Sequence, residues 1–303
     1  MIFLQVIAAL PGQTSPVLSL DFSADGLYLA SVSEETLMVW SVAEIEDSVS
    51  DGGDSMTPLS LGPPHMTRWR DRVAVTAAPD DMNRMVVIRD GAVTSMSPVE
   101  ESHVTCLMLS RDLHNVVFGT AAGRVKLYNC ADGSVRQLAE HQKPVTSVVI
   151  SDFLPIVVSG SVDTSVLITN IDTGVSIPCA GNVESVRDVR IIQRGEQVLS
   201  CSLSGVLHVW NTQTGLCELT IKSGATGHAT CLDVAERDGE TIAAISGVEG
   251  GVKIVELRSG QRLAEVGPKC APVRVVRFSP DGKLVVTGHD TGNVQVRHKH
   301  RVS

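Results

Sequence analysis

The chain has 303 residues, of which 43% are hydrophobic, 19% charged and only 3% aromatic, and its formal net charge is −9. This composition is typical of a soluble, mildly acidic globular protein. No apolar run approaches the roughly 20 residues that a membrane-spanning helix needs, so the sequence argues against membrane insertion.

The first predicted element is an apolar run at the N-terminus, Ile2–Ile7. At the other end of the chain, the last strand-like segment stops at Arg297 and leaves only residues 298–303 as a short tail. An unpaired sheet edge favours aggregation, so we expect residues 2–9 to pair with that last segment as an outer strand. A secretory signal is the alternative, although the run has no basic start and no clear cleavage site.

From residue 17 onward, one sequence pattern returns about every 41 residues. A run rich in β-branched residues leads into a polar turn that carries glycine, and two more short apolar runs follow. The clearest copies cover residues 17–40 and 273–297. Alternating apolar residues between clusters of Gly, Asp and Ser predict β-strands joined by tight turns. A period of this length predicts a solenoid, a propeller or another repeat array.

The copies number seven when the ends of their third strands are aligned. Those ends are Trp40, Arg89, Tyr128, Thr169, Trp210, Val255 and Arg297. Segments between the copies, such as residues 132–135 and 172–175, predict a fourth strand for each. No long segment has helical periodicity, so we predict an all-β chain whose seven copies form a single domain over residues 1–303. The copy at residues 66–96 has the least regular pattern.

Residues 44–64 break the composition of the first copy. This segment is acidic and rich in Ser, and it contains the pairs Gly52-Gly53 and Pro63-Pro64. It predicts an exposed loop insertion, which long surface loops tolerate at low entropic cost. A contact with a basic partner is the alternative role for it.

The repeated pattern resembles the WD40-repeat family of β-propellers. Residues Phe278–Gly282 match the family's Phe-Ser-Pro-Asp-Gly strand end, and Ser159–Asp163 match its Ser-Gly-Ser-x-Asp turn. His141 matches the opening His, while Trp40-Ser41 and Trp210-Asn211 match the closing Trp-Asp with the Asp replaced. The resemblance covers nearly the whole chain. It implies a seven-bladed WD40-like β-propeller, closed by the N-terminal strand within the last blade.

The same resemblance implies a buried hydrogen-bond network of His, Ser, Asp and Trp in each blade. Only the fourth copy carries its first three members, as His141, Ser159 and Asp163, and Thr169 stands where the Trp would be. An unpaired buried polar group costs about 1–3 kcal/mol. We therefore expect most other copies to have replaced the network with apolar packing.

Catalytic motifs are missing from the sequence. No nucleophile elbow, metalloprotease, phosphate-loop or dinucleotide pattern occurs in a suitable context. His298 and His300 share one face of the tail, but a frayed terminus explains them better than a metal site. The sequence therefore predicts no enzyme, no catalytic residue, no metal, no cofactor and no small-molecule substrate.

A nucleic-acid role depends on one basic cluster, Arg68-Trp69-Arg70-Asp71-Arg72. Trp69 would stack on an RNA base while Arg68 and Arg70 contact phosphates. The competing interpretation is an irregular strand whose arginines pair with the nearby acidic segment. The acidic net charge and the scarcity of aromatic residues favour the second interpretation, and an RNA-associated subunit remains the alternative function.

Binding of partner proteins is the function that the resemblance implies. In WD40 relatives, the start of each first strand and the turn after each second strand line a rim on one face. The first set here is Leu18, Thr105, Thr146, Arg187, Thr230 and Arg274. The second set includes Glu34, Glu35, Asp80, Asp81, Val162, Glu249 and His289. Arg187 and Arg274 occupy equivalent places and are candidates to bind an acidic peptide, or else they pair with nearby acids of the chain.

The expected function is a non-catalytic scaffold or adaptor within a larger intracellular complex, with peptides or domains of other proteins docking on the rim. The seven cysteines are odd in number, lie in separate copies and form no CxxC pair. That pattern predicts a reducing compartment, the cytoplasm or the nucleus.

Overall fold

The computed structural model describes most of the chain. The described residues are 2–10, 15–23, 25–33, 37–51, 59–61, 67–70, 73–77, 85–89, 92–96, 102–179, 181, 184–224, 228–237, 239–266 and 271–301. They divide into two compact units, one of residues 1–71 with 226–303 and one of residues 72–225. The described part is built almost entirely of antiparallel β-sheet, as the sequence predicted.

The unit of residues 72–225 contains three complete four-stranded sheets. Their strands are β10 (Val104–Leu109), β11 (Asn115–Thr120), β12 (Arg124–Asn129) and β13 (Val135–Glu140); β14 (Val145–Ile150), β15 (Ile156–Ser161), β16 (Val166–Asn170) and β17 (Ser176–Cys179); and β18 (Val186–Ile192), β19 (Gln197–Ser202), β20 (Val206–Asn211) and β21 (Cys217–Lys222). Before them come β7 (Val73–Ala77), β8 (Met85–Arg89) and β9 (Ala92–Met96), which pair in the same antiparallel order.

The unit of residues 1–71 and 226–303 contains three further four-stranded sheets. They are formed by β2 (Val17–Phe22), β3 (Tyr28–Ser33), β4 (Leu37–Ser41) and β5 (Leu59–Leu61); β22 (Ala229–Arg237), β23 (Glu240–Gly247), β24 (Val252–Glu256) and β25 (Arg262–Val266); and β26 (Val273–Phe278), β27 (Leu284–His289), β28 (Val294–Arg301) and β1 (Ile2–Leu10). Strand β6 (Thr67–Arg70) also belongs to this unit.

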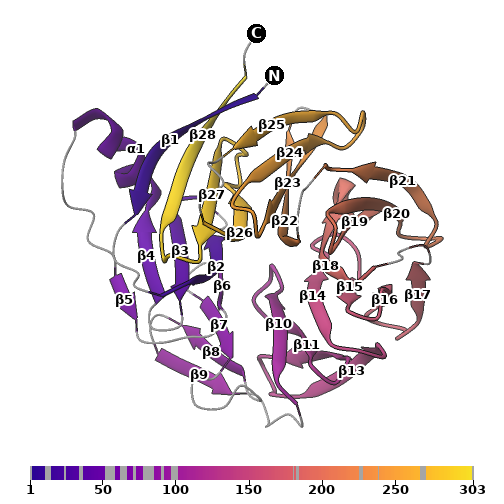
Figure 1. Cartoon of the computed structure of the whole chain (residues 1–303). Coiled ribbons are helices and arrows are strands. Elements are labelled where there is room, and N and C mark those ends of the chain that lie inside the picture. Colours follow the sequence, from indigo (N-terminus) through magenta and orange to yellow (C-terminus); the bar gives the residue numbers. More distant parts are fainter. Residues whose placement is uncertain are drawn as a thin grey trace. The chain divides into compact units, whose positions relative to one another are not determined.

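The two ends of the chain share one sheet. β1 runs antiparallel to β28, from the pair Ile2 and Arg301 to the pair Leu10 and Val294, and the two strands lie side by side in Figure 1. The N-terminal run is therefore the outer strand of the last sheet, as its position before the first repeat predicted.

Three of the described sheets pack on the next one through a glycine in their second strand. A Cβ atom on Gly119 would lie 2.5 Å from Cγ1 of Val145, and one on Gly160 would lie 2.6 Å from Cγ1 of Val186. The equivalent Gly288 would meet Cγ1 of Val17 at 2.5 Å. Real Cβ atoms do not approach so closely, so these positions require glycine. The valine that opens each following sheet thus fills the space over the glycine of the preceding one.

The segment 44–64, predicted to be a loop, contains a helix and a strand. Helix α1 (Val42–Asp51) follows β4 directly, and β5 supplies the fourth strand of the first sheet from within the same segment. The helix forms because Ser41 caps it, with its Oγ 3.5 Å from the backbone N–H of Glu44. Ile45 is fully buried and anchors the helix in the core cluster that also contains Trp40. Acidic composition concealed this short amphipathic helix from the sequence analysis.

Candidate partner-binding site

The first strand of each complete sheet carries a β-bulge after its first residue. The bulged residues are Leu18, Thr105, Thr146, Arg187, Thr230 and Arg274. They are the same six residues that the sequence assigned to the first set of the rim. A bulge leaves its extra residue out of the strand ladder and turns its side chain in a new direction. Six variable side chains are therefore presented by one repeated backbone feature.

The three bulged threonines bind backbone carbonyls. Thr105 Oγ1 donates to the carbonyl of Val145 at 2.6 Å, and Thr230 Oγ1 donates to the carbonyl of Val273 at 2.5 Å. Each of these bonds joins one sheet to the next within its unit. Thr146 instead donates to Gly160 O of its own sheet at 3.0 Å. The threonine hydroxyls thus hold the strand starts in place. The other bulged residues are the ones whose side chains could contact a partner.

The two bulged arginines differ in their surroundings. Arg274 Nε donates to Oδ1 of Asp290, and both side chains are partly exposed. Arg187 is half-buried, and in the described part of the chain its guanidinium has neither a hydrogen-bond acceptor nor an ion-pair partner. Its neighbour Asp188 does not serve, because that carboxylate pairs with Arg190 at 2.7 Å. Among the described residues, Arg187 is therefore a cation at a strand start without a counter-charge, and its buried Nε atom has no acceptor.

The other predicted rim residues lie in different settings. Glu249 is exposed in the turn between β23 and β24. His289, expected on the exposed rim, is instead buried at the end of β27. Glu34 lies outside the described residues. Arg68, Trp69 and Arg70 form most of β6, whose backbone is described without their side chains. The proposed RNA contact thus stays a prediction from the sequence.

A buried polar network occupies the start of the sheet β14–β17. His141 Nε2 lies 2.8 Å from Ser159 Oγ, and His141 Nδ1 lies 2.6 Å from Ser165 Oγ. The hydroxyl of Ser165 donates to Asp163 Oδ1 at 2.5 Å, and Asp163 Oδ2 accepts the backbone N–H of Gln142 at 2.7 Å. Ser165 links the predicted His to the predicted Asp and was not foreseen from the sequence.

Burial decides the protonation state of this network. Desolvation lowers the pKa of His141, and this outweighs the opposing attraction of Asp163, so the ring is neutral at pH 7. Partial burial favours the protonated form of Asp163, but hydrogen bonds from Ser165 and Gln142 bring its pKa below the usual value. A neutral ring with its proton on Nδ1 donates to Ser165 and accepts the hydroxyl proton of Ser159. Every polar atom of the chain of bonds then has a partner.

A second polar network, in the sheet β26–β28–β1, was not predicted. Arg297 Nη1 donates to Thr287 Oγ1 at 2.9 Å, and the same hydroxyl lies 3.1 Å from Nε2 of His289. Arg297 is only 3% exposed, its Nε atom has no acceptor in the described residues, and burial lowers the pKa of its guanidinium. Desolvation and the charge of Arg297 also lower the pKa of His289.

Both networks are built around a hydroxyl two residues before the end of the second strand. In the six sheets whose side chains are described, the residues at that place are Ser31, Phe118, Ser159, Ser200, Ile245 and Thr287, and four of them carry a hydroxyl. In two further sheets a tryptophan supplies the partner, because Trp40 Nε1 donates to Ser31 at 3.1 Å and Trp210 Nε1 to Ser200 at 2.8 Å. Among the six sheets whose side chains are described, those with buried Phe118 and Ile245 show the apolar replacement that the sequence predicted for most copies.

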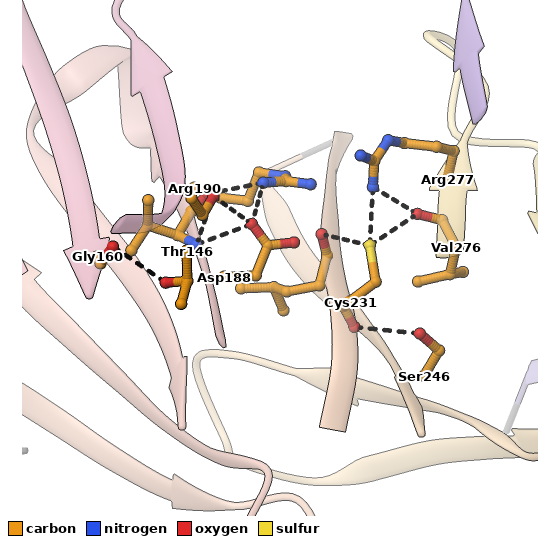
Figure 2. A network of polar contacts seen from close by, with 11 residues as sticks. Thr146, Gly160, Asp188, Arg190, Cys231, Ser246, Val276 and Arg277 are labelled. Carbon is orange, nitrogen blue, oxygen red and sulfur yellow. Dashed lines mark hydrogen bonds and ion pairs between the residues drawn. The ribbon is translucent and has the colours of Figure 1, made fainter. Parts of the chain in front are cut away.

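Two clusters of polar contacts connect neighbouring sheets inside the units, and Figure 2 shows both. In one, Asp188 of β18 accepts Arg190 Nη1 at 2.7 Å, as Figure 2 shows. The same carboxylate accepts Ser147 Oγ of β14 at 2.6 Å. In the other, Arg277 of β26 donates to Cys231 Sγ of β22 at 3.0 Å. These buried charged side chains are held within the sheet packing, so they do not offer free groups to a partner.

The geometry of His141 and Ser159 is that of a base beside a nucleophile, but Ser159 is 1% exposed and no substrate reaches it. In the part of the chain that the structure describes, no three His, Cys, Asp or Glu side chains gather as metal ligands. None of its helices combines the length and apolarity needed to cross a bilayer. The arrangement is suited to presenting side chains at strand starts.

Comparisons with known proteins agree with the repeat pattern. The family model "WD domain, G-beta repeat" matches residues 4–41, 132–170 and 260–297. Apoptotic protease-activating factor 1 of Rattus norvegicus and that of Homo sapiens are each 24% identical to the chain over 292 residues, which is 96% of the chain. The protein of that name from Danio rerio is 27% identical over 222 residues. The chain spans only 22% of the length of the rat and human relatives.

Proposed function

This chain belongs to the WD40-repeat family, and from that premise we propose that it is a seven-bladed β-propeller acting as a non-catalytic scaffold. Repeats of this family serve as protein-interaction modules. The scaffold would be a subunit of a larger assembly and would hold peptides or domains of partner proteins against its strand-start rim.

The packing of successive sheets supports the propeller. At three places inside the units, Gly119, Gly160 and Gly288, the glycine of a second strand receives the opening valine of the next sheet. When the same packing contact is repeated from one sheet to the next, the sheets are arranged radially. The pairing of β1 with β28 gives the last sheet its fourth strand. We propose that the seven copies close into one ring and form a single domain.

The observation that carries the binding role is the bulge beside Arg187. The sheets hold this residue rigidly, and its guanidinium has no partner among the described residues. A buried or half-buried polar group without a partner is unfavourable unless a ligand supplies one. Arg187 is therefore positioned to form a charge-assisted, two-pronged hydrogen bond with a carboxylate of a partner peptide.

The cysteines support a proposal about the compartment. The six described cysteines, from Cys106 to Cys231, are all free thiols, which supports a reducing environment. We propose that the protein works in the cytoplasm or the nucleus.

Quantitative affinity purification tests the scaffold role. We expect a defined set of proteins to co-purify with the wild-type chain and to fall by about tenfold with Arg187→Glu, because charge reversal repels a carboxylate. Lys222→Glu makes the same charge change on an exposed residue of the same sheet and is expected to keep the partner set.

Three outcomes would count against this function. One is a partner set that neither substitution changes. Another is turnover of a substrate by the purified chain that a substitution in a strand interior abolishes without unfolding it. The third is co-purification that depends on RNA and disappears when Arg68 and Arg70 are replaced, which would favour the RNA-associated alternative.

A further inference from the structure

Four turns lie at one edge of the sheets β14–β17 and β18–β21, and we call them the turn edge. They are residues 151–155, 171–175, 193–196 and 212–216. Each joins a strand to its antiparallel neighbour, and alternate turns of such a sheet fall on the same edge. Arg187 lies at the opposite end of β18, about 20 Å away for a strand of that length. The turn edge is thus separate from the rim.

Large apolar side chains are exposed along the turn edge. Phe153 is 59% exposed, Leu154 41%, Val175 62% and Leu216 67%. These are half of the large apolar residues that are exposed in the described part of the chain. Single exposed apolar residues are ordinary, whereas a group of them on one surface marks an interaction site.

The four turns form one continuous surface. A Cβ atom on Gly195 would lie 2.9 Å from Cδ1 of Leu154, so the short 3-10 turn η1 (Gln193–Gly195) packs directly on that side chain. The backbone N–H of Ile171 donates to Pro155 O at 2.7 Å, and that of Thr212 donates to Glu196 O at 3.1 Å. These contacts tie the turns together within the unit and keep the exposed side chains in fixed positions.

In the turn between the third and fourth strands, an exposed apolar residue after the glycine occurs in these two sheets and not in the sheets β10–β13 and β22–β25. Val175 and Leu216 follow the glycine of the turn between the third and fourth strands. The same place holds Ser134 in the sheet β10–β13 and Gln261 in the sheet β22–β25. The turn geometry therefore accepts polar residues, and it does not require Val or Leu.

Carboxylates outnumber cations around the apolar side chains, even with Arg136 of β13, whose guanidinium donates to Ile171 O, counted among the cations. The exposed residues of the four turns include the carboxylates Asp152, Asp172 and Glu196 and the single cation Arg194. An apolar surface with carboxylates at its margin is complementary to a segment that carries both large apolar side chains and lysine or arginine. An acidic segment would be repelled by the same margin.

We propose that the turn edge is a second docking surface, which binds a basic and apolar segment of a partner protein. This second surface goes beyond the rim-binding function, because it lies at the opposite end of the strands and would bind a basic rather than an acidic partner. A chain with both surfaces would connect two partners, one acidic at Arg187 and one basic at the turn edge.

Two synthetic peptides test this surface, one of alternating Leu and Lys and one of alternating Leu and Glu. We expect fluorescence anisotropy at physiological salt to show binding of the Leu–Lys peptide alone. The triple variant Phe153→Ser, Val175→Ser and Leu216→Gln should weaken that binding about tenfold while leaving the net charge unchanged. Val248→Ser removes an exposed apolar side chain elsewhere and should leave the affinity unchanged.

Several results would overturn the proposal. They are equal affinity of the triple variant and the wild type, equal binding of the Leu–Glu peptide, concentration-dependent dimers that the triple variant abolishes, and anionic phosphatidylserine vesicles captured by the wild type and not by the triple variant. Arg187→Glu should not weaken binding of the Leu–Lys peptide, so a failure of the rim function and a failure at the turn edge are distinguishable. Equal denaturation midpoints establish that the variants are folded.

Discussion

The sheets β14–β17 and β26–β28–β1 both carry a hydroxyl near the end of the second strand, but they surround it differently. In the first, Ser159 meets a neutral His141 whose other nitrogen is connected through Ser165 to Asp163. In the second, Thr287 meets Arg297, a buried cation whose Nε atom has no acceptor in the described residues. One network satisfies its polar atoms and the other leaves one unsatisfied.

This difference shows that the backbone of the repeat does not depend on one set of polar side chains. Both sheets keep the same strand order and the same bulge after the first residue of the first strand. What changes is how completely the buried groups are paired, and hence how much each sheet contributes to stability. Substitutions at the two networks should therefore have opposite effects.

The largest effect is expected from His141→Ala. The substitution leaves Ser159 and Ser165 without their partner in the sheet interior and creates a cavity, so the free energy of unfolding should fall by about 3 kcal/mol. Urea denaturation followed by fluorescence measures the change. Gln142→Ala, at the exposed neighbouring residue, should stay within about 0.5 kcal/mol of the wild type. A small loss for His141→Ala would show that the network is not stabilising.

The second effect is a loss of stability on mild acidification. Burial lowers the pKa values of His141 and His289 in the folded chain, so the unfolded chain binds protons more readily. The stabilisation is complete above the ordinary histidine pKa near 6.5 and is lost as the pH falls below it, by up to about 1.4 kcal/mol per pH unit for each ring. Arg297 reinforces the shift at His289, whereas Asp290 there and Asp163 at His141 oppose it.

Denaturation midpoints between pH 7.5 and pH 5.5 measure this dependence. His289→Gln keeps a polar side chain but cannot titrate, and it should give a shallower slope than the wild type. A wild-type stability that is flat over this range, or a slope that His289→Gln leaves unchanged, would contradict the assignment.

A gain of about 1 kcal/mol is expected from Arg297→Trp. The indole would donate to Thr287 as Trp40 does to Ser31 and Trp210 to Ser200. The substitution would also remove a buried cation that has no carboxylate partner among the described residues. Chemical denaturation measures the gain. It should disappear when Thr287→Val removes the acceptor in the same chain, and a stability below that of the wild type would contradict the comparison of the two networks.

The smallest effect on stability is expected from Arg187→Met. This change removes a half-buried cation without a partner in the described residues and keeps the aliphatic stem, so stability should stay within about 0.5 kcal/mol of the wild type or rise slightly. Partner binding should nevertheless be lost. A clear destabilisation would instead assign Arg187 a structural role.

Much of the fold was predictable because it depends on local pattern. Alternating apolar residues and turn glycines gave the strands, and the missing fourth strand after Arg297 predicted the pairing of residues 2–9. Helix α1 was missed because acidic residues and serines suggested a loop. The signal that reveals it is Ser41 followed three residues later by Glu44, with Val42 and Ile45 spaced for one buried face.

The polar networks were less predictable because they depend on residues brought together from different turns. His141, Ser159 and Asp163 were recognisable from the resemblance, but Ser165 joins them only through the turn that contains Thr164, whose φ is 73°. The alignment of third-strand ends placed Arg297 at the position of Trp40 and Trp210, but only the packing shows that it is buried and donates to Thr287. Likewise, the sequence could not show that Asp188 pairs with Arg190 rather than with its other neighbour, Arg187.

Hydrogen exchange of the complex with a co-purified partner tests the rim most directly. We expect slower exchange on binding at the strand starts around Thr105, Thr146 and Arg187 and in the turns after the second strands, with the strand interiors unchanged. Protection confined to the turn edge, or none at the strand starts, would contradict the claim that the bulged residues form the partner-binding rim.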